Sequence, residues 1–187
     1  SRGLGDVYKR QLLYTINPML QPQAPELEEA VLGACLIEKE GMPQVENLLK
    51  PEMFYVTRHQ MIYAALLTMF HAGTDIDILT VTEELRKRGK LDDAGGPFYI
   101  TQLSSRVASS AHLEYHARII HQKYLRREMI LGFNKLLALS ADETIDLADT
   151  LVDAHNLMDR LEGECGHNRQ LREMDALMEA TLTEAEG

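Results

Sequence analysis

The chain has 187 residues, of which 45% are hydrophobic and 26% are charged, a balance typical of a globular protein large enough to bury a core. No uninterrupted apolar run approaches the length of a membrane-spanning helix, so we expect a cytoplasmic protein without membrane segments. Cys35 and Cys165 lie far apart and belong to no CxxC pair. Neither a disulfide framework nor a zinc site is therefore indicated.

The net charge of −10 is concentrated at one end of the chain. Before residue 142 there are 16 acidic and 16 basic residues, whereas from Asp142 onward 13 acidic residues stand against three arginines. Affinity for nucleic acid comes largely from Lys and Arg side chains that neutralise phosphates. The acidic end therefore favours a protein partner, and a basic one in particular.

The first residues do not resemble a natural start. Ser1 opens the chain and the first methionine is Met19, while residues 6–11 can be encoded by GATGTGTATAAGAGACAG, which looks like a transposon end used in sequencing libraries. We expect residues 1–11 to be a sequencing or cloning scar. Residues 12–23 contain two prolines and are expected to form a flexible tail.

Residues 24–110 are predicted to form a compact domain of orthogonally packed helices. Pro25 and the acidic residues after it are typical of a helix start, and apolar spacing continues that helix to about Glu38. Short helices are expected to start at Pro43 and Pro51. No stretch of this region shows the sustained alternation of a β-hairpin, so the fold class is predicted to be all-α.

Two capping boxes are predicted further along this domain. Thr57 with Gln60, and Thr80 with Glu83, have the spacing at which side chains satisfy the free amides of a first helical turn. The two helices are expected to end near Ala72 and Arg88, because Gly73 and Gly89 follow where a left-handed residue is favoured. Gly95-Gly96 should break the chain before a further short helix that ends near Ser104.

Residues 111–163 are predicted to form a long antiparallel helical hairpin. Residues 111–140 contain no proline, Ser110 is a suitable N-cap, and residues 141–144 should form the turn before a second helix that ends near Glu162. Apolar residues of that helix are spaced four, three, four and three, which is the seam of a helix packed on another and a candidate surface for self-association. These residues are Leu147, Leu151, Ala154, Met158 and Leu161.

Residues 164–187 are predicted to contain a linker and the start of a linker helix. A polar segment is followed by an amphipathic stripe at helical spacing. A helix this short is marginal alone in water, so its apolar face is expected to dock on another surface. The stripe consists of Leu171, Met174, Met178 and Leu182.

No catalytic, cofactor-binding or metal site is predicted. A phosphate-binding loop needs the pattern GxxxxGK[ST], and Gly89-Lys90 is followed by Leu91 in place of the hydroxyl residue. His112 and His116 lie one helical turn apart, but their order does not match HExxH, so solvated or structural roles are favoured over a metal enzyme. A third interpretation is a nucleic-acid-binding face on the long helix. That face would consist of Arg118, Lys123, Arg126, Arg127 and Lys135.

Several blocks of the sequence, taken in order and spacing, resemble the amino-terminal domain of DnaB-family replicative helicases. They cover residues 24–120, and the hairpin and terminal stripe agree with the same family through residue 187. The blocks are Pro25 to Ala34, Leu49 to Tyr55, His59 with Ile62 and Tyr63, Ile76 to Leu85, Gly89 to Leu91, Gly95-Gly96 with Tyr99, and Ser110 to Ile120.

This resemblance implies a subunit of a hexameric ring whose amino-terminal domains form a collar, with hairpins pairing neighbouring subunits. It implies docking of primase and, in some systems, of a loader protein at the replication fork, and packing of the linker helix on the motor domain of an adjacent subunit. The motor domain, which would hold ATP and magnesium, contact DNA and unwind the duplex, is absent from this sequence. We therefore expect no enzyme activity from this chain alone; a stand-alone helical adaptor or nucleic-acid-binding module of the replisome is the alternative.

Overall fold

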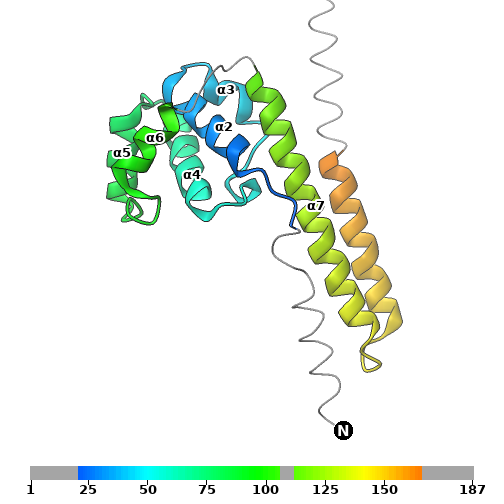
Figure 1. Ribbon diagram of the computed structural model, residues 1–187. Coiled ribbons are helices and arrows are strands. Elements are labelled where there is room, and N and C mark those ends of the chain that lie inside the picture. Colours follow the sequence, from blue (N-terminus) through cyan, green and yellow to red (C-terminus); the bar gives the residue numbers. More distant parts are fainter. Residues whose placement is uncertain (1–20, 106–111, 166–187) are drawn as a thin grey trace, which may run out of the picture. The chain divides into compact units, whose positions relative to one another are not determined.

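The computed structural model describes residues 21–105 and 112–165, and these residues form helices and connecting turns without any β-strand (Figure 1). The all-α prediction is therefore confirmed for the described part. The described residues divide into two compact units, one ending at Arg126 and one beginning at Arg127. The predictions for residues 1–11, for most of the tail, for the Ser110 cap and for the stripe Leu171, Met174, Met178 and Leu182 lie outside the described residues.

Helix α2 (Pro25–Ile37) lies at the centre of the first unit and contacts α3 (Gly41–Val45), α4 (Thr57–His71) and α6 (Gly96–Ser105) (Figure 1). Pro25 is in the first turn of α2, as predicted. Helix α3 starts at Gly41, two residues before Pro43, and Gly41 lies close to the backbone of α2. A Cβ atom at Gly41 would stand 3.0 Å from the Ala34 carbonyl oxygen, so a larger residue would require the backbone of α2 to shift by a few tenths of an ångström.

The prediction that Thr57 and Gln60 cap α4 is wrong. The N-cap is Val56, without a side-chain capping bond, and the Gln60 amide instead donates to the Phe54 carbonyl oxygen at 2.7 Å. The backbone N–H groups of Tyr55 and Val56 donate to the carboxylate of Glu28. A side chain of α2 therefore satisfies amides just before α4, whereas no side-chain bond caps the first turn of the helix itself. The short helix predicted at Pro51 is present as η2 (Pro51–Met53).

The second predicted capping box is displaced by three residues. Helix α5 (Ile78–Lys87) is capped by Asp77, whose Oδ1 accepts from the N–H groups of Leu79 and Thr80, both at 2.8 Å. Thr80 Oγ1 in turn accepts from the Asp77 N–H at 2.9 Å. Thr80 is therefore the reciprocating member of the box and not its cap, because Asp77 can start the helix three residues earlier.

The predicted ends of α4 and α5 are confirmed. Gly73 and Gly89 have φ angles of 65° and 64°, a left-handed conformation that glycine adopts without steric cost and that directs the chain away from each helix. Helix α6 begins at Gly96, the second glycine of the predicted break.

The core of the first unit includes the amino-terminal part of α7 (Leu113–Ser140). Leu113, Ala117 and Ile120 are each at most 1% exposed. These buried side chains belong to the first unit, which groups residues up to Arg126 of α7. The boundary between residues 110 and 111 stays a prediction of the sequence. None of the described helices is long and apolar enough to cross a membrane.

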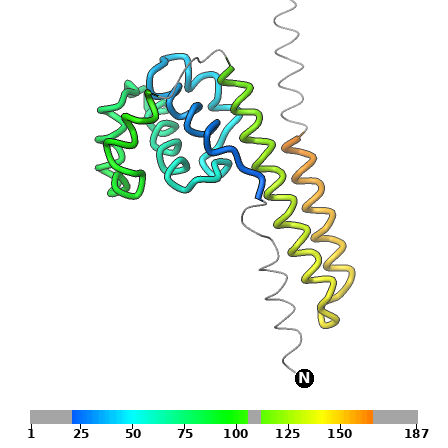
Figure 2. Tube along the Cα trace, in the orientation of Figure 1, coloured from blue at the N-terminus to red at the C-terminus, as the bar shows by residue number. Residues whose placement is uncertain are grey.

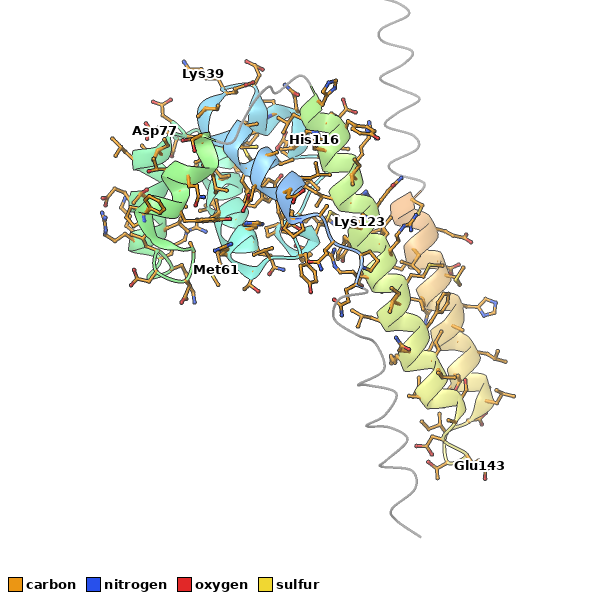
Figure 3. All side chains as sticks on the ribbon, in the orientation of Figure 1. Lys39, Met61, Asp77, His116, Lys123 and Glu143 are labelled. Carbon is orange, nitrogen blue, oxygen red and sulfur yellow. The ribbon has the colours of Figure 1, made fainter. Side chains whose placement is uncertain are left out.

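The second unit is a helical hairpin. The part of α7 from Arg127 onward is followed by a turn that contains Glu143 and by a second helix over residues 147–165, antiparallel to α7 (Figures 2 and 3). The second helix continues past Glu162, through Gly163, to the edge of the described residues. One exposed glycine lowers helix stability by about 1 kcal/mol, which is too little to end a helix here.

Candidate assembly interface

The two helices of the hairpin meet along a narrow seam. The side chains of Thr150, Leu157 and Leu161 in the second helix are 6–9% exposed, and Ala154 on the same stripe is half-buried. On α7 the seam passes over Gly132, where an added Cβ atom would stand 2.5 Å from Leu157 Cδ2. The only glycine of α7 therefore marks a point where the helices pack closely, and a larger residue there would require the Leu157 side chain to move.

Large apolar side chains lie exposed on both helices beside this seam. In α7 they are four residues apart, and in the second helix they are four and seven apart, so each set forms a stripe along one side of its helix. The exposed stripe of α7 is Met129, Phe133 and Leu137, and that of the second helix is Leu147, Leu151 and Met158.

Helical geometry places the two stripes on the same face of the hairpin. Each residue advances about 100° around a helix, so Phe133 follows the inward-facing Gly132 by about 100° and Met158 follows the inward-facing Leu157 by the same angle. In the antiparallel neighbour the chain runs the opposite way, and the seam lies on the opposite side of that helix. The same rotation of about 100° therefore points to the same face of the hairpin in both helices. We call this surface, formed by both stripes, the apolar face.

The opposite face of the hairpin is charged and internally paired. Lys135 Nζ lies 2.9 Å from Asp153 Oδ2, and Arg160 Nη1 lies 2.8 Å from Glu128 Oε2. By the same geometry all four residues lie on the other side of the seam from the apolar face. The hairpin is therefore amphipathic as a unit: ion pairs cross the seam on one side, and exposed apolar side chains gather on the other. Among the described residues of the hairpin, Leu131 and Val152 are the exposed large apolar side chains that lie outside the apolar face, at 55% and 57%.

The residues of the predicted self-association stripe lie in two different places, some in the seam and some on the apolar face. Leu161 is 8% exposed and packs in the seam, and Ala154 lies at its edge, whereas Leu151 and Met158 are 53% and 39% exposed on the apolar face together with Leu147. Whether these residues contact another chain stays a prediction. The α7 half of the apolar face was missed, although the spacing of four between Met129, Phe133 and Leu137 could have revealed it.

The histidines considered for a metal site do not gather a third ligand. The rings of His112 and His116 have centroids 6.5 Å apart, and within the described ranges no group of three metal-ligating side chains is found. Partial burial, and then the neighbouring His112, lower the pKa of His116. Figure 3 shows His116 on the first part of α7.

The basic residues considered for nucleic acid are partly neutralised within the chain. Arg118 pairs with Glu114 one turn earlier, and Lys135 pairs with Asp153. Lys123, labelled in Figure 3, and Arg126 lie on the same helix. Ion pairing lowers the positive potential that a phosphate backbone would meet, so this set is a weaker candidate than the apolar face.

A groove of about 420 Å³ lies between α4 and α5. Its walls include Met69, Leu79, Glu83, Glu84 and Lys87. Glu83 and Glu84 pair with arginines of their own helix, at Arg86 and Arg88 respectively. Both carboxylates of the groove are therefore engaged by arginines of the same segment.

Comparison with known proteins agrees with this architecture. A family model described as the DnaB-like helicase N terminal domain matches residues 20–122, more than half of the chain. The chain belongs to this family. The resemblance seen in the sequence is therefore confirmed.

Two relatives show how much of a replicative helicase is similar to this chain. It is 47% identical to the replicative DNA helicase DnaB of Rhodothermus marinus over 76% of this chain and 14% of that protein. It is 36% identical to the replicative DNA helicase DnaC of Bacillus subtilis over 62% of this chain and 25% of that protein. The similarity therefore spans a quarter or less of the length of these helicases.

Two solved structures share the fold. The N-terminal domain of DnaB helicase from Mycobacterium tuberculosis is 30% identical with a TM-score of 0.70, and the match covers 75% of this chain and 98% of that one. A DnaB-like replicative helicase solved for its interactions with primase is 23% identical with a TM-score of 0.62, over 75% of this chain and 31% of that one. The second likeness concerns the fold alone.

Proposed function

We propose that this chain is the assembly domain of a replicative DNA helicase, and that the apolar face of its hairpin pairs it with a second copy. The observation that carries the proposal is the exposure of six large apolar side chains on one face of the hairpin, whereas the other side has two, Leu131 and Val152, beside its charged pairs. Contiguous apolar patches on a soluble surface mark interaction sites, because covering them removes apolar area from water.

In the full-length helicase these domains would form the collar of a hexameric ring in the cytoplasm, at the replication fork. ATP and magnesium would belong to the motor domain, which would also contact DNA and unwind the duplex. The stripe of Leu171, Met174, Met178 and Leu182 would dock on the motor domain of a neighbouring subunit. The chain alone supplies assembly and docking, without catalysis.

The hairpin offers a matched pair of variants to test self-association. Leu151 and Val152 are neighbours in the same helix and are 53% and 57% exposed, but Leu151 lies on the apolar face and Val152 on the opposite face. We expect Leu151→Glu to weaken self-association at least about tenfold, because each interface would bury unpaired carboxylates, whereas Val152→Glu should leave it nearly unchanged.

Sedimentation equilibrium at several concentrations measures both variants against the unmodified chain, and circular dichroism checks that each retains its helices. A chain that stays monomeric at high concentration would contradict the proposed assembly. Equal weakening by Leu151→Glu and Val152→Glu would contradict the proposed face.

The proposed assembly domain would also dock primase and, where one exists, a loader protein. Membership of the DnaB family supports primase as the first partner to test. Titration calorimetry of the chain with the carboxy-terminal domain of the cognate primase should show saturable heat. Absence of heat at high concentrations of both proteins would remove the primase proposal and leave self-association standing.

A further inference from the structure

The methionine side chains of the described residues differ sharply in exposure between the two units. In the described part of the first unit three methionines are at most 4% exposed and a fourth is half-buried. The three are Met42, Met53 and Met69, and the fourth is Met61. In the hairpin, Met129 and Met158 are 41% and 39% exposed, and both lie on the apolar face. We call these two residues the methionine pair.

Two contacts between the helices place the methionine pair at one level of the hairpin. The ion pair of Arg160 with Glu128 is the first contact, and the close approach of Leu157 to Gly132 is the second. In each helix the methionine lies between these two contacts in sequence. Since four residues of an α-helix rise by only about 6 Å, the two methionines lie within about one helical turn of each other along the hairpin. They therefore form one patch of two thioethers on the apolar face.

A thioether on a surface has a chemistry that the leucines and the phenylalanine of the same face lack. Hydrogen peroxide transfers one oxygen atom to the sulfur of methionine: an S–O bond forms, the O–O bond breaks, and the second oxygen leaves in water. The sulfur loses two electrons to the peroxide, which is reduced. The sulfoxide that results is polar where the thioether was apolar, and a sulfoxide reductase reverses the change.

We propose that the methionine pair is an oxidation site at which a peroxide weakens the pairing of two apolar faces. This inference rests on the proposed self-association, because it assigns a modification to the same surface. Each copy would bring two sulfoxide oxygens into the interface, and a buried polar group without a hydrogen-bond partner costs free energy. Association covers the two sulfurs in turn, so the assembled chain is protected and the dissociated chain is open to oxidation.

The order in which the methionines react tests the site itself. The full chain is treated with dilute hydrogen peroxide, and peptide mass spectrometry follows the addition of one oxygen atom to each methionine. All samples carry Cys165→Ser, because Cys165 is an exposed thiol that would also react. Cys35 needs no substitution, since burial raises its pKa to about 12 and keeps it an unreactive thiol.

We expect Met129 and Met158 to be oxidised before Met61, and well before the three buried methionines. Their oxidation should slow as the protein concentration rises, because association covers them, whereas the rate at Met61 should stay constant. Oxidation of the buried methionines as fast as the methionine pair would overturn the proposal.

The effect on assembly is measured by sedimentation equilibrium before and after peroxide treatment. Oxidation of both methionines should raise the dissociation constant at least about tenfold. The double variant Met129→Leu with Met158→Leu keeps side chains of similar apolar volume that cannot form a sulfoxide, so its association should not respond to peroxide. Met61→Leu is the matched control and should respond as fully as the chain that keeps all its methionines. Circular dichroism checks that every treated sample retains its helices.

Unchanged association after complete oxidation of the methionine pair would contradict the proposal. So would an equal loss of association in the double leucine variant, because the damage would then lie elsewhere. A chain that is monomeric before treatment contradicts the proposed self-association, whereas an associating chain that does not respond to oxidation contradicts the methionine pair alone.

Discussion

The two units of this chain handle their apolar side chains in opposite ways. In the first unit the apolar residues of α2, α4, α5 and α6 converge on one core in which most are at most a few per cent exposed. Across the described residues, every buried side-chain nitrogen or oxygen has a hydrogen-bond partner. Beside its core the first unit exposes four large apolar side chains, at Ile37, Leu79, Phe98 and Tyr115. In the described part of the hairpin the balance is reversed, because two apolar side chains are buried, Leu157 and Leu161, and eight large ones are exposed. The first unit is therefore built to be stable by itself, and the hairpin to be completed by a partner.

The largest expected effect tests the self-sufficiency of the first unit. Leu66 is fully buried in α4, so Leu66→Ala should remove about 2–5 kcal/mol from the free energy of unfolding through lost burial and a residual cavity. Leu79→Ala is the control, because Leu79 is 77% exposed, and it should change stability by less than about 0.5 kcal/mol. Urea denaturation measures both, and similar losses for the two variants would mean that the core is not where the structure places it.

The next effect tests the seam of the hairpin. An alanine at either Gly132 or Gly163 gains about 1 kcal/mol of helix propensity, but only at Gly132 would the new methyl group meet Leu157. Gly163→Ala should therefore stabilise the hairpin, and Gly132→Ala should be less stable than Gly163→Ala by about 1–3 kcal/mol. Thermal unfolding at one fixed protein concentration compares them, and equal stability would show that the helices do not meet at Gly132.

A smaller effect tests a local feature of the first unit. Asp77→Ala removes the cap of α5 and should cost about 1 kcal/mol, whereas Asp77→Asn keeps a capping oxygen and should cost less. Hydrogen bonds from the Thr80 backbone hold the pKa of Asp77 below its usual range. The charged cap therefore stabilises the fold above the usual aspartate range and loses this contribution as pH falls.

Denaturation between pH 7 and pH 3 should show a shallower loss of stability for Asp77→Asn than for the unmodified chain. Parallel pH profiles would argue against the cap.

Helix positions were predictable from sequence because their signals are local. Pro25, Gly73 and Gly89 act on the residues beside them, and the structure places helix ends there. The hydrogen bonds just before α4 were not predictable, because Glu28 accepts from the N–H groups of Tyr55 and Val56, which lie 27 and 28 residues away in sequence. Thr57 with Gln60 has the right spacing for a cap, but the side-chain bonds at this point of the chain come from the distant carboxylate of Glu28 to the N–H groups that precede the helix.

The apolar face was predicted in part for a similar reason. A spacing of four and three identifies residues on one side of a helix, but does not say which of them face the other helix of the hairpin. Leu157 takes the inward position because Gly132 leaves room for it, and this rotates Leu151 and Met158 outward. That choice depends on the packing of two helices and cannot be obtained from the pattern of one.

The central claim is that another copy of this chain covers the apolar face. Met129 and Met158 place one methyl probe on each helix of that face, and Met61 in α4 provides a control in the first unit. Methyl NMR of methionine-labelled protein over a dilution series tests the claim most directly. We predict that the Met129 and Met158 signals shift together on dilution while the Met61 signal stays constant. Concentration-independent Met129 and Met158 signals, in a range where sedimentation shows association, would contradict the claim.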